Sequence, residues 1–256
     1  MNVEESQKSP WIRIVLMIVC VVGFVVLPVV LFLYFYPSPL ITLMVKTSYP
    51  KDSYPLLYKT PTTVVVNESA ASGPDYEANG VNYNSPWGEV DEMIESGDSV
   101  GFKFADDRSV LIFGTDVSAN LVKPFLAEVT DYEKELFVNV FGEDALSNDY
   151  ELRRHVLFSD ASSMKFVMSP ATAVSTYSLL NLKVASAMYV QDDEGEIVAF
   201  TANNIKGFWF DRQDEVGTIL ITMYPLNNND LPYEMSIKGT KQEIEAILNS
   251  VVIELK

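Results

Sequence analysis

Cysteine and histidine are almost missing from this chain, which has one of each in 256 residues. A single cysteine excludes an internal disulfide framework, a cysteine-rich zinc module and an iron–sulfur cluster, because each of these needs several thiolates. The sequence also lacks a Walker A motif, G-x-G-x-x-G, H-E-x-x-H and G-x-S-x-G, so nucleotide-binding, zinc-protease and esterase chemistry have no residue support. We therefore expect no cofactor and no metal site, and the catalytic residues, if any, are unknown.

Positive charge is scarce as well. The chain has 18 Lys and Arg against 35 Asp and Glu, which gives a net charge of −17. Such a chain repels a phosphate backbone instead of neutralising it, so nucleic acid is not expected as a partner. Hydrophobic residues make up 48% of the chain, which excludes disorder as its main state.

A long uncharged segment is the strongest signal that is present. From Ile14 to Tyr36 the chain has no charged residue, and a helix of that length, at about 1.5 Å per residue, covers the roughly 30 Å hydrocarbon core. Trp11 and the aromatic residues 34–36 stand at its two ends, where interfacial rings belong. The residues after Pro28 are bulky, unlike a signal-peptide cleavage site. We expect an uncleaved single-pass transmembrane helix in contact with the lipid bilayer, with Cys20 inside it.

The positive residues near this segment predict its orientation. Lys8 and Arg13 precede it, and the first positive residue after it is Lys46. By the positive-inside rule the short N-terminus lies in the cytoplasm and the bulk domain is extracytoplasmic. The predicted organisation is a tail over residues 1–13, the transmembrane helix over 14–36, a proline-rich extended stalk over 37–61, and an acidic α+β domain over 62–256.

Alternating apolar and polar residues predict the strands of that domain. Residues 67–85 are polar and indicate a long loop. A hairpin is expected from Ser99–Phe104 and Ser109–Phe113, across a turn at Asp106 and Asp107. Further strands are expected at Glu196–Thr201, Lys206–Asp211, Gly217–Tyr224, Tyr233–Lys238 and Val251–Leu255.

Helix start signals mark the middle of the chain and its end. Thr130 with Glu133, Asn148 with Glu151, and Thr240 with Glu243 have the spacing of a capping box. Ser169-Pro170 combines an N-cap residue with proline at the first helical position, and predicts a helix to about Met188. The fold class that follows is α+β: one domain with an antiparallel sheet packed by a few helices.

Four groups of residues are candidates for chemistry. His155 is the only histidine, so a catalytic triad would combine it with Ser159, Ser162 or Ser163; a structural role is the alternative. Arg153 and Arg154 form a basic spot for an anion, or pair with Asp149 and Glu151. The carboxylates Asp192, Asp193, Glu194 and Glu196 could hold Ca²⁺ or form a solvated hairpin turn, and residues 227–230, Asn-Asn-Asn-Asp, indicate a turn.

Three consecutive aromatic residues, Phe208, Trp209 and Phe210, fall within one predicted strand. In a strand the indole of Trp209 faces opposite to the two phenyl rings. Either both faces of this strand belong to the core, which we expect because a helix must pack on the sheet, or one face exposes aromatic surface to a ligand or a partner.

Several segments together resemble an uncharacterised group of bacterial membrane-anchored or exported proteins. The resemblance covers most of residues 60–256, and it implies one folded unit without any activity, cofactor or catalytic residue. It is carried by SPW at Ser85–Trp87, the hairpin Gly101–Phe113, DYELRRHVLFS from Asp149, LLNLK from Leu179, KGFWF from Lys206, and TKQEIEAILNSV from Thr240.

The function expected from these observations is a membrane-anchored interaction or ligand-binding module that does no catalysis, with a possible protein partner at the membrane. Two alternatives remain open at this point. One is a hydrolase that uses carboxylates or a metal ion, and the other is an accessory subunit of a membrane protein complex.

Overall fold

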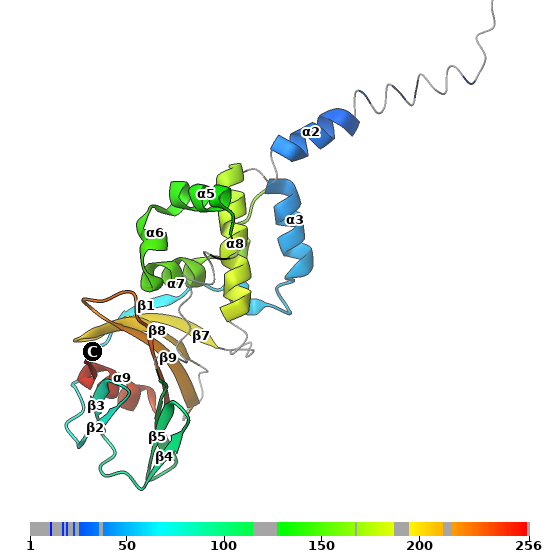
Figure 1. Cartoon of the computed structure of the whole chain (residues 1–256). Helices are drawn as coiled ribbons and strands as arrows, with labels where there is room; N and C mark the ends of the chain where they lie inside the picture. Colours follow the sequence, from blue (N-terminus) through cyan, green and yellow to red (C-terminus); the bar gives the residue numbers. More distant parts are fainter. Residues whose placement is uncertain are drawn as a thin grey trace, which may run out of the picture.

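The computed structural model describes residues 27–35, 38–114, 129–166, 168–186, 195–211 and 217–254, with residues 11, 17, 19, 23, 26 and 127. The fold is α+β, as predicted. An eight-stranded sheet lies between a helical lobe on one face and a three-stranded sheet with helix α9 (Lys241–Ser250) on the other (Figure 1).

The single transmembrane helix expected over residues 14–36 is corrected by the structure. Within the described residues no helix is both long enough and apolar enough to cross a membrane. The continuous described part of the segment forms α2 (Leu27–Phe35), a helix of nine residues. At about 1.5 Å per residue, α2 is less than half as long as the roughly 30 Å hydrocarbon core. The rest of the segment, including Cys20, lies largely outside the described residues, and the extracytoplasmic placement stays a prediction.

The first part of the expected stalk is helical instead of extended. Helix α3 (Ser38–Ser48) tolerates Pro39 because a proline in the first turn removes no helical hydrogen bond. Its inner side is fixed to the lobe: the Ser38 hydroxyl donates to the Phe166 carbonyl, and the Thr42 hydroxyl to the Lys165 carbonyl, each at 3.0 Å. These long-range bonds, which no local pattern reveals, explain why the expectation of extended chain was wrong here. The predicted domain boundaries remain a prediction.

The large sheet is mixed, not purely antiparallel. Its strand order is β1-β7-β8-β9-β10-β6-β5-β4. Strand β1 (Thr62–Val65) pairs in parallel with β7, whereas all other pairs are antiparallel. A parallel pair needs a long crossover, and here the chain between β1 and β7 includes β2 and β3, β4 to β6 and most of the helical lobe. The other strands are β4 (Glu92–Ser96), β5 (Ser99–Phe104), β6 (Arg108–Ile112), β7 (Glu196–Thr201), β8 (Ile205–Asp211), β9 (Gly217–Pro225) and β10 (Tyr233–Gly239).

The small sheet closes one face of the large one. It has the order β11-β3-β2 and consists of β2 (Asp75–Ala78), β3 (Val81–Asn84) and β11 (Val252–Ile253). Helix α9 begins at the predicted capping box of Thr240 and Glu243. Its apolar residues Ile244, Ile247 and Leu248 join the main core, which lies between the two sheets.

The helical lobe covers the other face. It contains α5 (Asp131–Phe141), α6 (Asp144–Ser147), α7 (Asp149–Phe158), the long α8 (Pro170–Ser186), and the short 3₁₀ helices η2 (Pro55–Tyr58) and η3 (Ala161–Ser163). The predicted capping box of Thr130 and Glu133 opens α5, and Asn148 accepts a hydrogen bond from the Glu151 amide at the start of α7. Helix α7 packs directly on the sheet, through Leu157 against Ile197, Ala199 and Phe208.

The strand with three aromatic residues confirms that both sheet faces are core. Trp209 belongs to the cluster that faces the small sheet, while Phe208 belongs to the cluster under α7. Both side chains are buried. The aromatic run therefore serves packing, and it marks no exposed ligand surface.

One charged side chain connects three parts of the lobe. Lys183 on α8 is fully buried, and its ammonium donates to the carbonyls of Lys59, Leu157 and Ser159 at 2.8, 2.8 and 2.6 Å. It thus ties α8 to the end of α7 and to the segment before β1. Burial lowers the pKa of Lys183 from 10.5 to about 8, although the Asp160 carboxylate acts in the opposite direction.

We expect Lys183→Met to lower the free energy of unfolding by about 3 kcal/mol, because three carbonyls in the protein interior lose this donor. Urea denaturation at neutral pH measures the change. The control Lys51→Met replaces an exposed lysine and should change stability by less than about 0.5 kcal/mol. Equal effects of the two substitutions would contradict the role of Lys183.

The lowered pKa of Lys183 also predicts a pH dependence. Between about pH 8 and 10.5 the unfolded chain binds more protons at this side chain than the folded chain does, so its contribution to stability rises with pH in that window. The stability difference between the wild type and Lys183→Met should therefore grow as the pH is raised above 8. A difference that shrinks over this range would show that the folded pKa is not lowered.

Candidate functional site

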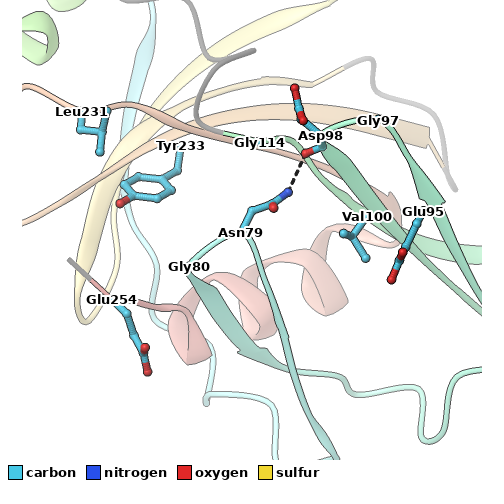
Figure 2. Close-up of a pocket in the computed structure, with 10 residues that line it drawn as sticks. All are labelled: Asn79, Gly80, Glu95, Gly97, Asp98, Val100, Gly114, Leu231, Tyr233 and Glu254. Atoms are coloured by element: carbon cyan, nitrogen blue, oxygen red, sulfur yellow. Dashed lines mark hydrogen bonds between the residues drawn. The ribbon is translucent and has the colours of Figure 1, made fainter. Parts of the chain in front are cut away.

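A cleft of about 430 Å³ opens where the tips of two hairpins meet. One tip is the turn between β2 and β3, and the other is the turn between β4 and β5 (Figure 2). The start of β10 and the residue after β11 complete its walls. The lining residues are Asn79, Gly80, Glu95, Gly97, Asp98, Val100, Gly114, Leu231, Tyr233 and Glu254.

Asn79 holds the two hairpin tips together. Asn79 and Gly80 have φ angles of 51° and 78°, the left-handed conformation of a two-residue hairpin turn, which asparagine and glycine adopt most readily. This conformation directs the Asn79 side chain at the neighbouring hairpin, where its Nδ2 donates to the Asp98 carbonyl at 2.8 Å (Figure 2). The same Nδ2 also donates to the Ile112 carbonyl on β6 at 3.2 Å. The small sheet is thereby fixed to the large one at the floor of the cleft.

Glycines permit the close approach of the chain segments around the cleft. A Cβ atom at Gly114 would lie 2.5 Å from the Asp98 carbonyl oxygen, which is impossible without a shift of the backbone. Gly97 occupies the left-handed region with φ of 58° and makes the tight turn that precedes Asp98. A larger residue at position 114 would push the turn between β4 and β5 away from the segment that follows β6.

The apolar part of the cleft belongs to the main core. Tyr233 is 4% exposed and packs in that core, which Val100 contacts from its edge. Burial raises the pKa of Tyr233, so its phenol stays neutral well above neutral pH. Leu231, by contrast, is 39% exposed at the mouth of the cleft. The cleft therefore has a rigid aromatic and aliphatic wall.

The charges around the cleft all have one sign. Glu95, Asp98 and Glu254 are exposed carboxylates, and no lysine, arginine or histidine is among its described lining residues. Glu95 and Asp98 belong to the β4–β5 hairpin and Glu254 follows β11, and the three carboxylates do not point at a common centre (Figure 2). Throughout the described part of the chain, no group of three His, Cys, Asp or Glu side chains is placed to share a metal ion. The arrangement suits a cationic ligand with several charges better than a single ion.

The side chains considered for a catalytic triad make packing contacts and local hydrogen bonds to other residues. His155 lies against the Phe141 ring, with 4.9 Å between ring centroids, and burial lowers its pKa. The Ser159 hydroxyl donates to the Val156 carbonyl at 2.6 Å. Ser162 and Ser163 bond to Asp160 through their hydroxyls. The geometry thus favours the structural alternative for His155.

The two arginines pair with acidic residues of their own helix. Arg154 contacts Glu151 at 3.1 Å. Arg153 contacts Asp149 at 3.5 Å and donates through Nε to the Tyr224 hydroxyl at 2.9 Å. Tyr224 in turn donates to Asp149 at 2.5 Å, and both side chains are fully buried. This network anchors the start of α7 on β9 and presents no basic spot for an anion.

The remaining candidates are mostly turns. Asp106 and Asp107 form the hairpin turn between β5 and β6, with φ angles of 57° and 60°. Residues 227–230 form the loop between β9 and β10, where the Asp230 amide donates to the Asn228 side chain. Asp192, Asp193 and Glu194 lie outside the described residues, and Glu196 begins β7.

The residues of the cleft were not found by the sequence reasoning, although one signal was available. The Asn79-Gly80 dipeptide, between Ala78 and Val81, is the strongest short hairpin signal that a sequence can carry. It falls in the polar stretch 67–85, which was expected to be a long loop. No comparable signal marks Tyr233 or Glu254, because they reach the cleft only through tertiary folding.

Substitutions at Asn79 test how the cleft is held. Asn79→Gly keeps the left-handed turn but loses both side-chain hydrogen bonds, and should lower the free energy of unfolding by about 1 kcal/mol. Asn79→Ala also introduces left-handed strain, and should lower it by about 2 kcal/mol. Chemical denaturation of both variants gives the two values. An Asn79→Gly variant as stable as the wild type would show that the bonds to Asp98 and Ile112 contribute nothing.

Comparisons of the chain with protein-family models, with curated proteins and with solved structures find no match. No residue role is therefore carried over from a relative, and the resemblance to bacterial membrane-anchored or exported proteins stays a prediction. The candidate site rests on the geometry and the charge of the cleft.

Proposed function

We propose that this chain is a non-catalytic binding module that receives a basic, extended segment of a partner protein in the cleft between the two hairpin tips. The observation that carries the proposal is the combination of three carboxylates with an apolar wall, in a cleft whose described lining residues include no cation. Its volume of about 430 Å³ lies in the usual range of ligand sites. We call this cleft the acidic cleft.

Lysine and arginine side chains match both parts of the acidic cleft. Their aliphatic stems pack on apolar surface while their charged ends stay at the water boundary. Here Val100, Leu231 and the Tyr233 ring offer the apolar surface, and the carboxylates of Glu95 and Glu254 stand at the rim. A segment with two or three cations would reach several carboxylates at once, which gives it an advantage over a single small cation.

An open sheet edge next to the acidic cleft supports an extended partner. Among the described strands, β4 pairs only with β5, so its other side offers unpaired backbone donors and acceptors. Met93 and Ile94 on β4 are 56% and 38% exposed, and Glu95 belongs both to β4 and to the cleft. An added strand would gain main-chain hydrogen bonds along β4 and specificity from the cleft.

The hydrolase alternative gains no support from this site. Glu95, Asp98 and Glu254 are exposed and do not converge, whereas hydrolysis by paired acids needs two carboxyl groups set around one bond in a cleft. The accessory-subunit alternative differs from the proposal only in the partner, and the affinity experiment below applies to it as well.

Neutralising the acidic cleft should weaken the binding of a basic peptide. The probe is a capped peptide in which lysine alternates with threonine, titrated by calorimetry into the full chain. The triple variant Glu95→Gln, Asp98→Asn, Glu254→Gln should bind it about tenfold more weakly, because three exposed ion pairs together contribute about 1.4 kcal/mol.

A matched triple variant separates the site from the overall charge. Asp52→Asn, Glu135→Gln, Glu143→Gln removes the same charge from exposed positions outside the cleft and should leave the affinity within about twofold, since distant exposed charges are screened. Equal weakening by both triple variants, or no measurable binding by the wild type, would overturn the proposal.

A further inference from the structure

Exposed apolar side chains gather on the two N-terminal helices. On α2 and α3 together, large apolar residues are close to half exposed or more at eight positions, far from the acidic cleft (Figure 1). They are Leu27 53%, Val29 51%, Val30 54%, Leu31 47% and Phe32 53% on α2, and Leu40 45%, Leu43 53% and Met44 48% on α3. Water is an unfavourable environment for a surface of this kind.

Helix α2 is apolar on all sides. Val29 to Phe32 are consecutive, and consecutive residues point about 100° apart around a helix, so their exposure cannot be confined to one face. A groove on a protein would cover one side of such a helix and leave the rest in water. A helix that is apolar all round is stable in a protein core or in lipid, and the described structure places α2 outside the core.

Helix α3 has one buried and one exposed face, and its contacts with the lobe fix which face is exposed. Ser38, Thr42 and Val45 are buried against the lobe, with the two hydroxyls bonded to the carbonyls of Phe166 and Lys165. The opposite face therefore carries Leu40, Leu43 and Met44. Phe166, which is 54% exposed, lies alongside the helix: its carbonyl accepts from Ser38, and the Lys46 ammonium is 5.2 Å from its ring centroid.

The charge of this region differs from that of the rest of the chain. Although the protein has 35 acidic residues, none lies between Glu5 and Asp52, whereas Lys46 and Lys51 follow the apolar face of α3. A leaflet that contains anionic lipids has a negative surface potential, which attracts lysines and repels carboxylates. The α2–α3 surface is thus the part of this acidic protein that can approach such a bilayer closely.

We propose that the apolar surface of α2 and α3 contacts a lipid bilayer, with α3 lying against the bilayer and the helical lobe held next to it. In this arrangement α3, which has one exposed apolar face, lies in the interface, and α2, which is apolar on all sides, is immersed among the acyl chains. The proposal requires no helix that crosses the bilayer. It is independent of the function proposed for the acidic cleft, because the two surfaces share no residue.

The test uses a fluorescent reporter on α3 in the full chain. Cys20→Ser removes the native thiol, and Leu43→Cys carries an environment-sensitive fluorophore. With vesicles of phosphatidylcholine and phosphatidylglycerol, its emission should move to shorter wavelength, and most of its intensity should be lost when the vesicles contain nitroxide-labelled lipid. The same fluorophore at Met93→Cys on β4, an equally exposed position, should show neither effect.

Substitutions in the labelled protein tie the signal to the α3 face. Leu40→Glu places a carboxylate one turn from the reporter and should reduce the lipid quenching at position 43. Leu226→Glu, on an equally exposed leucine in the loop after β9, should leave it unchanged.

Three results would overturn the proposal. One is a reporter at position 43 that is not quenched in protein bound to vesicles. Another is equal quenching at positions 43 and 93. The third is an emission shift to shorter wavelength when no lipid is present and the protein is oligomeric, which would show that a second copy covers this face of α3. None of these results bears on peptide binding by the acidic cleft, so the two proposals can fail separately.

Discussion

The need to bury both faces of the large sheet determines the rest of this structure. In β8 the side chains of Phe208 and Trp209 point to opposite faces, and both are buried. Apolar residues on two faces of one sheet require two covering layers. The helical lobe supplies one of them through α7, and the small sheet with α9 supplies the other. The positions of the acidic cleft and of the α2–α3 surface both follow from this three-layer arrangement.

The acidic cleft exists because the small sheet covers the large one incompletely. At the hairpin tips Asn79 bridges the two sheets through main-chain carbonyls of the large sheet. Backbone turns with left-handed residues leave room there, and acidic residues at the rim keep the opening hydrated. The peptide binding proposed for this cleft needs no catalytic group.

Two of the few positive residues in this chain, Lys183 and Arg153, join elements of the structure through buried hydrogen bonds. Lys183 saturates three carbonyls at the ends of other elements, and Arg153 completes a network with Asp149 and Tyr224. Both networks join segments that are distant in sequence. Loss of either side chain would therefore disturb the packing of more than one element. Helix α3 is attached by hydroxyl-to-carbonyl bonds instead, which leaves its outer face free for another contact.

The sequence by itself determined the features that depend on near neighbours. Capping at Thr130 and Thr240, the turn at Asp106 and Asp107, and the alternation around Trp209 were predicted correctly because each involves residues a few positions apart. Tertiary structure alone decided the parallel pairing of β1, the helical state of α3, the burial of Lys183 and the hydrogen bonds of Asn79 to Asp98 and Ile112. These features depend on contacts between residues far apart in the chain, and local propensity carries no information about such contacts.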